Sequence, residues 1–143
     1  MRLAVVVSRY NENITRGLLE GALRTFRKHG ISSGLKDTVW VPGAFEIPLA
    51  AQTLARTRKY AAVIALGCVL KGETSHHHYI SKSVAQALMD IGLETNVPVA
   101  FGVLTPNSMK QAKARSGKGS GNKGEEAAEA AIEMARSLQR LKG

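Results

Sequence analysis

The sequence predicts an α/β protein, a three-layer αβα sandwich around a four-stranded parallel sheet. Short apolar runs rich in β-branched residues alternate with longer segments whose apolar residues recur at helical spacing. Because each strand is followed by a helix, the connections are crossovers, which favour parallel strands with helices on both faces. The chain has 143 residues, and we see neither an internal repeat nor a linker, so we expect a single domain over residues 1–143.

The first two strand–helix units are marked by their turn residues. In order, these elements are a strand at Arg2–Val7, a helix at Ile14–Phe26, a strand at Asp37–Val41 and a helix at Phe45–Arg58. A polar break at Ser8–Asn13 separates the first pair, and Gly30 is a natural C-terminal cap for the first helix. Pro42 and Gly43 end the second strand, while Pro48 is tolerated because it falls in a first helical turn.

The remaining elements continue the alternation. They are a strand at Ala61–Leu70, a helix with apolar positions from Ile80 to Ile91, a strand at Pro98–Leu104, a short helix within Thr105–Arg115, and a last helix with apolar positions from Ala128 to Leu138. The run Ala61–Leu70 is the most apolar of the chain, which is typical of a central parallel strand. Gly72 ends this run, and Pro106 is expected near the start of the short helix.

Composition narrows the class of protein. The apolar runs are shorter than the roughly 20 residues of a membrane span, so we expect no membrane partner. The N-terminal apolar run has no small-residue cleavage site and is typical of a first strand rather than a secretion signal. The single cysteine, Cys68, cannot form an internal disulfide, which favours a cytoplasmic protein.

The net charge of +9 raises the question of a polyanionic partner. Basic residues are densest in Met109–Gly124, which is either a solvated surface or a surface that contains an anion site. Aromatic residues make up 5% of the chain and offer few stacking surfaces for single strands. Nucleic acid is therefore not the expected partner despite the basic charge.

Four loops should meet at the carboxyl edge of the sheet, where parallel sheets bind their ligands: Ser8–Asn13, Pro42–Glu46, Lys71–His76 and Thr105–Asn107. The ring of Tyr10 beside the amide of Asn11 suits a flat heterocycle. Phe45 and Glu46 add a second ring and a carboxylate that can accept hydrogen bonds from hydroxyls. Taken one at a time, these loops are better explained by ordinary turn chemistry than by function.

The stretch LKGETSHHHYI contains three of the four histidines. Successive residues of a helix point about 100° apart, so His76, His77 and His78 are unsuited to binding one metal ion. Metal-binding helices use i, i+4 spacing, and Ile80 occupies that place relative to His76. A single imidazole, that of His76, can instead transfer protons near physiological pH. The preceding Gly72, with Thr74 and Ser75, could offer backbone N–H groups to an anion or act as a helix cap.

Four motifs together, VPGAFEIP, GCVLKGETSH, FGVLTPN and GNKGEEAAEAAIEMA, resemble the lumazine synthase family. The similarity runs from VVVSRYN to the last helix in the family's order and spacing. It implies a flavodoxin-like fold and a transferase of riboflavin biosynthesis. The implied reaction condenses 5-amino-6-(D-ribitylamino)uracil with 3,4-dihydroxy-2-butanone 4-phosphate to 6,7-dimethyl-8-ribityllumazine, releasing phosphate and water. The resemblance implies neither a cofactor nor a metal.

The resemblance also implies roles for individual residues. Those matching the pyrimidine and ribityl subsites are Tyr10, Asn11, Ala44, Phe45, Glu46, Cys68, Val69 and Leu70. Among them, Tyr10 corresponds to the aromatic residue that stacks on the pyrimidine, and Glu46 to the one that binds ribityl hydroxyls. Glu73 and Thr74 match the phosphate-binding turn, and His76 matches the histidine that transfers protons.

Three further residues match positions supplied by a neighbouring subunit: Phe101 near the pyrimidine, Arg115 at the phosphate, and Lys123 as added positive potential. The resemblance therefore implies a homo-pentamer with active sites between subunits. The chain starts almost at its first strand, so a larger shell is expected less than the pentamer.

Several positions depart from the family pattern. His77 and His78 replace an aromatic and a polar residue, Lys71 replaces a frequent arginine, and Lys118 lies in an unusually basic loop. Two alternatives remain: a noncatalytic or engineered assembly on the same scaffold, cationic to hold polyanions, and a flavodoxin-like module that binds nucleotides or nucleic acid. The second lacks both GxGxxG and a P-loop.

Overall fold

A computed structural model describes residues 1–72 and 76–143 and contains a four-stranded sheet. Its strands are β1 (Leu3–Ser8), β2 (Thr38–Val41), β3 (Ala62–Cys68) and β4 (Val99–Leu104). They are all parallel and lie in the order β2-β1-β3-β4. The predicted fold class is confirmed.

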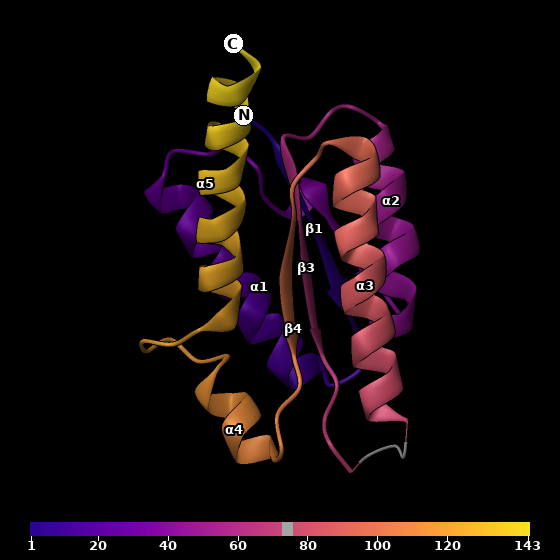
Figure 1. Ribbon diagram of the computed structural model, residues 1–143. Coiled ribbons are helices and arrows are strands. Elements are labelled where there is room, and N and C mark those ends of the chain that lie inside the picture. Colours follow the sequence, from indigo (N-terminus) through magenta and orange to yellow (C-terminus); the bar gives the residue numbers. More distant parts are fainter. Residues whose placement is uncertain (73–75) are drawn as a thin grey trace.

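Helices cover both faces of the sheet (Figure 1). They are α1 (Glu12–Lys28), α2 (Ile47–Arg56), α3 (His77–Thr95), α4 (Met109–Ala114) and α5 (Lys123–Lys142). Helices α1 and α5 lie together on one face, and α2 and α3 lie together on the other. The short α4 lies near the carboxyl end of β4. No helix of the described residues is long and apolar enough to cross a membrane.

The sheet separates two apolar cores, and the alternation of side chains along β1 shows why. Leu3, Val5 and Val7 pack toward α1 and α5, whereas Ala4 and Val6 pack toward α2 and α3. Every residue of β1 and β3 is buried. Burial on both faces explains why these strands are continuous apolar runs in the sequence rather than alternating ones.

Local signals located the ends of the first helix and of the strands only approximately, but they identified individual turn residues. Helix α1 ends in a Schellman motif, in which the Ile31 N–H donates to the Phe26 carbonyl (2.9 Å) and the Gly30 N–H to the Arg27 carbonyl (3.1 Å). Gly30 adopts the positive φ of 69° that this motif requires, as predicted. Pro48 lies in the first turn of α2, also as predicted. That helix follows a 3₁₀ turn at Ala44–Glu46 and so begins later than expected.

The start of the short helix was predicted wrongly. Pro106 lies before α4, and its carbonyl accepts a hydrogen bond from the Lys71 N–H (3.0 Å), which connects the two loops. The helix starts after Ser108, whose hydroxyl accepts from the Gln111 N–H (3.2 Å) as an N-cap.

Helix α5 starts earlier than its apolar stripe suggested, because Asn122 caps it. Its side-chain oxygen accepts from the N–H groups of Gly124 and Glu125, and its amide nitrogen donates to the carbonyls of Gly17 (3.1 Å) and Gly117 (3.0 Å). The buried Asn122 side chain therefore connects α1, the loop before α5, and α5 itself through hydrogen bonds.

The strand order determines where a ligand can enter. From β1 the chain passes to β2 on one side and then to β3 on the other side of β1. Connections that leave neighbouring strands in opposite directions open a crevice at the carboxyl ends of those strands. The carboxyl edge beside β1 and β3 is thus the place to look for a site.

Candidate functional site

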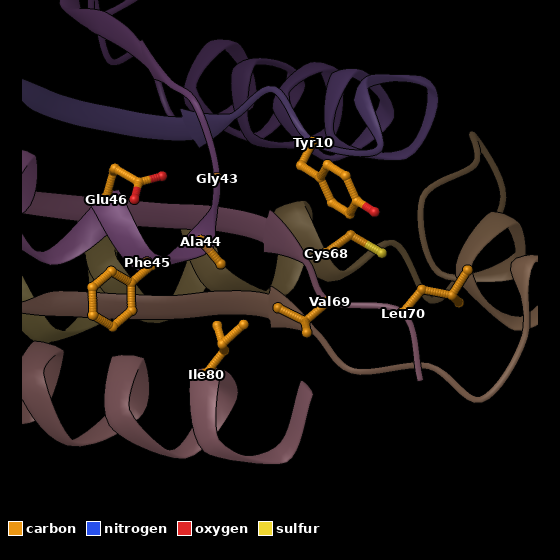
Figure 2. A pocket seen from close by; sticks show the side chains of 9 residues that line it. All are labelled: Tyr10, Gly43, Ala44, Phe45, Glu46, Cys68, Val69, Leu70 and Ile80. Atoms are coloured by element: carbon orange, nitrogen blue, oxygen red, sulfur yellow. The ribbon is translucent and has the colours of Figure 1, made fainter. Parts of the chain in front are cut away.

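A cavity of about 240 Å³ lies at this carboxyl edge. Its lining comes from the segments after β1 and β2, from the end of β3 and the residues that follow it, and from α3: Tyr10, Gly43, Ala44, Phe45, Glu46, Cys68, Val69, Leu70 and Ile80 (Figure 2). Seven of these nine residues were predicted from the sequence. Segments far apart in the chain therefore line one cavity. This arrangement would not be expected if each loop served only as a turn.

Backbone hydrogen bonds bring the Tyr10 loop to the cavity. The N–H groups of Arg9 and Tyr10 donate to the carbonyls of Val41 (2.8 Å) and Pro42 (3.1 Å), which extends the contact between β1 and β2 past the strand ends. Asn11 then turns the chain into α1 with a left-handed backbone (φ 62°). The Asn11 side chain does not line the cavity. Its amide nitrogen donates to the Cys68 carbonyl (3.4 Å) and joins the loops after β1 and β3.

Two aromatic rings are left accessible around the cavity. Tyr10 is 56% exposed and Phe45 is 66% exposed, whereas Cys68 and Val69 between them are buried. In Figure 2 the Tyr10 ring lies beside Cys68, and the Phe45 ring lies at the opposite end, near Ile80. An apolar floor with exposed rings suits a flat, partly apolar ligand.

Glu46 contributes the carboxylate of the cavity lining. One of its oxygens, Oε1, lies so close to Gly43 that a Cβ at that position would be 3.2 Å away. A glycine at position 43 therefore leaves room for this orientation of the carboxylate. Ionised oxygens at the border of an apolar hollow can accept hydrogen bonds from ligand hydroxyls.

The three histidines occupy different surroundings. His76 is the exposed residue immediately before α3, and its ring centroid lies 6.3 Å from that of Tyr79. His77 is half-buried, and His78 is exposed with its ring 6.0 Å from Tyr79. Among the described residues, no group of three His, Cys, Asp or Glu side chains is arranged to hold a metal ion. Glu73 and Thr74, predicted to bind phosphate, lie outside the described residues, as does the neighbouring Ser75.

The residues assigned to a neighbouring subunit lie elsewhere in this chain. Of the described residues that line the cavity, none is Phe101, Arg115 or Lys123. Phe101 lies on the edge strand β4 and is 38% exposed. Arg115 follows α4 and borders a separate hollow of about 380 Å³, together with Leu104 and Thr105. Lys123 is the first residue of α5.

Sequence reasoning missed two lining residues, Gly43 and Ile80. Gly43 was taken as a turn residue. Ile80 was assigned to the apolar stripe of a helix, where contact with a core and contact with a cavity give the same periodicity. Its position four residues after His76, at the start of a helix beside the loops, was the available signal.

The fold agrees with the match of this chain to a known protein family. The family model described as 6,7-dimethyl-8-ribityllumazine synthase matches residues 1–139. The chain belongs to this family. It is accordingly a transferase of riboflavin biosynthesis, in a family whose members act on small molecules and assemble as oligomers.

Proposed function

We propose that this protein condenses 5-amino-6-(D-ribitylamino)uracil with 3,4-dihydroxy-2-butanone 4-phosphate to give 6,7-dimethyl-8-ribityllumazine, phosphate and water. This is the penultimate step of riboflavin biosynthesis. The observation that carries the proposal is the cavity at the switch point of the sheet, because seven residues predicted for the pyrimidine and ribityl subsites line it.

The aminouracil is assigned to this cavity. Tyr10 stacks on the pyrimidine, backbone groups of Cys68–Leu70 bind its edge, and Asn11 holds the adjoining loop. Ala44 and Phe45 flank the ribityl chain, whose hydroxyls donate hydrogen bonds to the Glu46 carboxylate. The exposed ring of Tyr10 and the accessible carboxylate of Glu46 support these assignments.

The phosphorylated butanone is assigned to the loop before α3. Phosphate binding is assigned to Glu73 and Thr74, and proton transfer to His76. The aromatic amine attacks the ketone and water leaves to give an imine, after which phosphate is eliminated. The resulting enol tautomerises, and the ribityl-bearing nitrogen closes the ring with loss of a second water. These steps require no cofactor, because each is an addition, an elimination or a proton transfer without net oxidation or reduction. Orienting the two reactants lowers the barrier by on the order of 7–11 kcal/mol in favourable cases.

The complete site is assigned to the interface of a homo-pentamer. Phe101, Arg115 and Lys123 of a neighbouring subunit complete the pyrimidine and phosphate subsites. The cavity of about 240 Å³ in one chain is smaller than the roughly 300–1,000 Å³ of typical ligand pockets, which supports a contribution from a second chain. We assign the activity to residues 1–143 as one domain and to the cytoplasm, in keeping with the single cysteine.

The direct test mixes the two substrates with the purified protein and follows the fluorescence of the lumazine product. Formation of the product at a rate proportional to enzyme concentration is expected. No increase over the uncatalysed reaction would contradict the proposal. Native mass spectrometry of the same sample should show the pentamer.

A further inference from the structure

Arg115 is held by an ion pair that the reaction as proposed does not use. Its Nη2 lies 2.6 Å from Oε2 of Glu126, in the first turn of α5. The two side chains are 43% and 52% exposed. An exposed pair of this kind contributes little to folding stability, so its effect has to be sought in where it holds the guanidinium.

The backbone around this pair is fixed independently. The Lys123 N–H donates to the Arg115 carbonyl (2.8 Å), which ties the end of α4 to the start of α5. Asn122 anchors the same loop to α1 through the Gly17 carbonyl. The Cα of Arg115 is thus well located, whereas its long side chain has several rotatable bonds and needs a further contact to hold one direction.

The contact with Glu126 leaves Arg115 able to bind an anion. A guanidinium has five N–H donors in a planar fork, and the ion pair recorded here joins Nη2 to one carboxylate oxygen. With one side of the guanidinium bound to Glu126, its remaining N–H donors can still form paired hydrogen bonds to phosphate oxygens. Glu126 also lowers the local positive potential, so its net effect on anion binding depends on whether orientation or charge dominates.

We propose that Glu126 is a positioning residue for the phosphate subsite, and that it orients the Arg115 guanidinium toward the phosphate of the substrate bound by a neighbouring subunit. This inference rests on the proposed function of Arg115. Orientation dominates over charge, because a fixed fork loses less side-chain entropy when it binds phosphate than a free one does.

The experiment compares Glu126→Ala and Glu126→Gln with the parent enzyme. Glu126→Ala should raise the KM for the butanone phosphate, and the inhibition constant of inorganic phosphate, by up to about tenfold, because the freed Arg115 side chain must then be ordered when phosphate binds. The kcat, the KM for the aminouracil and the Tm should stay as in the parent. Glu126→Gln keeps an oxygen acceptor for Arg115 and should restore part of the loss.

Glu125→Ala is the matched control. Glu125 lies in the same first turn of α5 and pairs with Arg24 (2.9 Å), so its removal reproduces the loss of a carboxylate and of an ion pair without touching Arg115. It should leave phosphate inhibition unchanged. Equal effects of Glu125→Ala and Glu126→Ala would assign the result to general electrostatics and overturn the inference.

Arg115→Ala separates the inference from the function on which it rests. Phosphate binding by both variants is measured in an NMR titration with inorganic phosphate. If Arg115→Ala binds phosphate more weakly than the parent, while Glu126→Ala binds it equally well or more tightly, the positioning role of Glu126 is wrong but the phosphate subsite stands. If neither variant changes phosphate binding, the assignment of Arg115 itself is wrong.

Discussion

The strands β1, β2 and β3 carry different chemistry at their two ends. At the carboxyl ends, the following segments diverge and leave a cavity bordered by the exposed rings of Tyr10 and Phe45. At the amino ends, residues just before the same strands converge on Asp37, whose Oδ1 accepts hydrogen bonds from Arg2 Nη2 (2.7 Å) and the Tyr60 hydroxyl (3.0 Å). The Asp37 side chain is 1% exposed.

The two ends of the same strands therefore differ in structure: a buried polar cluster lies at one end and an accessible cavity at the other. Burial alone would raise the pKa of Asp37, but the hydrogen bonds from Arg2 and Tyr60 and the positive charge of Arg2 hold it below its ordinary value. Burial, and then the hydrogen bond to Asp37, raise the pKa of Tyr60. The amino edge therefore has polar groups that hydrogen-bond to one another, while the carboxyl edge has exposed side chains around a cavity.

Changes at the carboxyl edge should alter catalysis without altering stability, and His76→Ala should have the largest effect. General acid–base catalysis contributes ~10²–10⁴-fold, so kcat should fall by that factor. A residual rate should remain from the orientation of the two reactants. Steady-state kinetics measure the loss of kcat, and a thermal melt should show an unchanged Tm.

His78→Ala, at an exposed neighbouring histidine, is the control and should behave as the parent does. A His76→Ala protein as active as the parent would show that the role is assigned wrongly.

Changes at the amino edge should lower stability without altering catalysis. Tyr60→Phe tests this expectation by removing a single oxygen atom. Losing the hydroxyl that donates to Asp37 should lower the free energy of unfolding by about 2 kcal/mol, the scale of a hydrogen bond to a charged group. Denaturant unfolding measures this loss, and the kinetic constants should not change. Tyr79→Phe, at a tyrosine that is 67% exposed, should leave the unfolding midpoint unchanged. If Tyr60→Phe and Tyr79→Phe lost equal free energy of unfolding, the special role of the amino edge in stability would be contradicted.

A smaller effect is expected for the ring of Tyr10. Base–aromatic stacking contributes ~1–3 kcal/mol, so Tyr10→Ala should raise the KM for the aminouracil by about tenfold. Tyr10→Phe keeps the ring and should keep the parent KM. Because Tyr10 is exposed, neither variant should change the Tm. If Tyr10→Phe is as impaired as Tyr10→Ala, the hydroxyl rather than the ring is what the substrate contacts.

The smallest effect is the dependence of stability on pH. The folded-state pKa of Asp37 is depressed, so its contribution is complete above its ordinary pKa of 3.8 and is lost as the pH falls through the lower folded value. The folded-state pKa of Tyr60 is raised, so its contribution is complete below 10.0 and is lost as the pH rises through the higher folded value. Unfolding followed across this range should show both losses. In Asp37→Asn the acid loss should be reduced, and an unchanged acid limb would contradict the assignment.

The sequence predicted features that depend on local rules. Gly30 was identified as a cap because the positive φ after a helix favours glycine whatever lies nearby. The buried strands were identified because their apolar runs are continuous. Features that depend on contacts between distant segments were missed. Pro106 was placed near the start of the short helix, because the hydrogen bond from the Lys71 N–H to its carbonyl cannot be predicted from local sequence. Asp37 was assigned to a strand, although its partners Arg2 and Tyr60 hold it in a 3₁₀ turn before that strand.

The candidate site shows the same division. Motifs identified Tyr10, Phe45 and Glu46, since residues after parallel strands gather at one edge whatever the strand order. They did not identify Ile80, whose periodicity is that of a core residue, nor the pair between Arg115 and Glu126, which joins two helices. Partner choice among charged side chains depends on tertiary distances that sequence spacing does not contain.

The separation of Arg115 from the cavity of its own chain has a consequence for mixed assemblies. A subunit with His76→Ala still carries an intact Arg115, and a subunit with Arg115→Ala still carries an intact His76. In the proposed pentamer, some interfaces between the two variants would combine both intact residues, and about a quarter of all interfaces would do so in a random equal mixture. Two poorly active proteins, unfolded and reassembled together, would then regain activity that neither has alone.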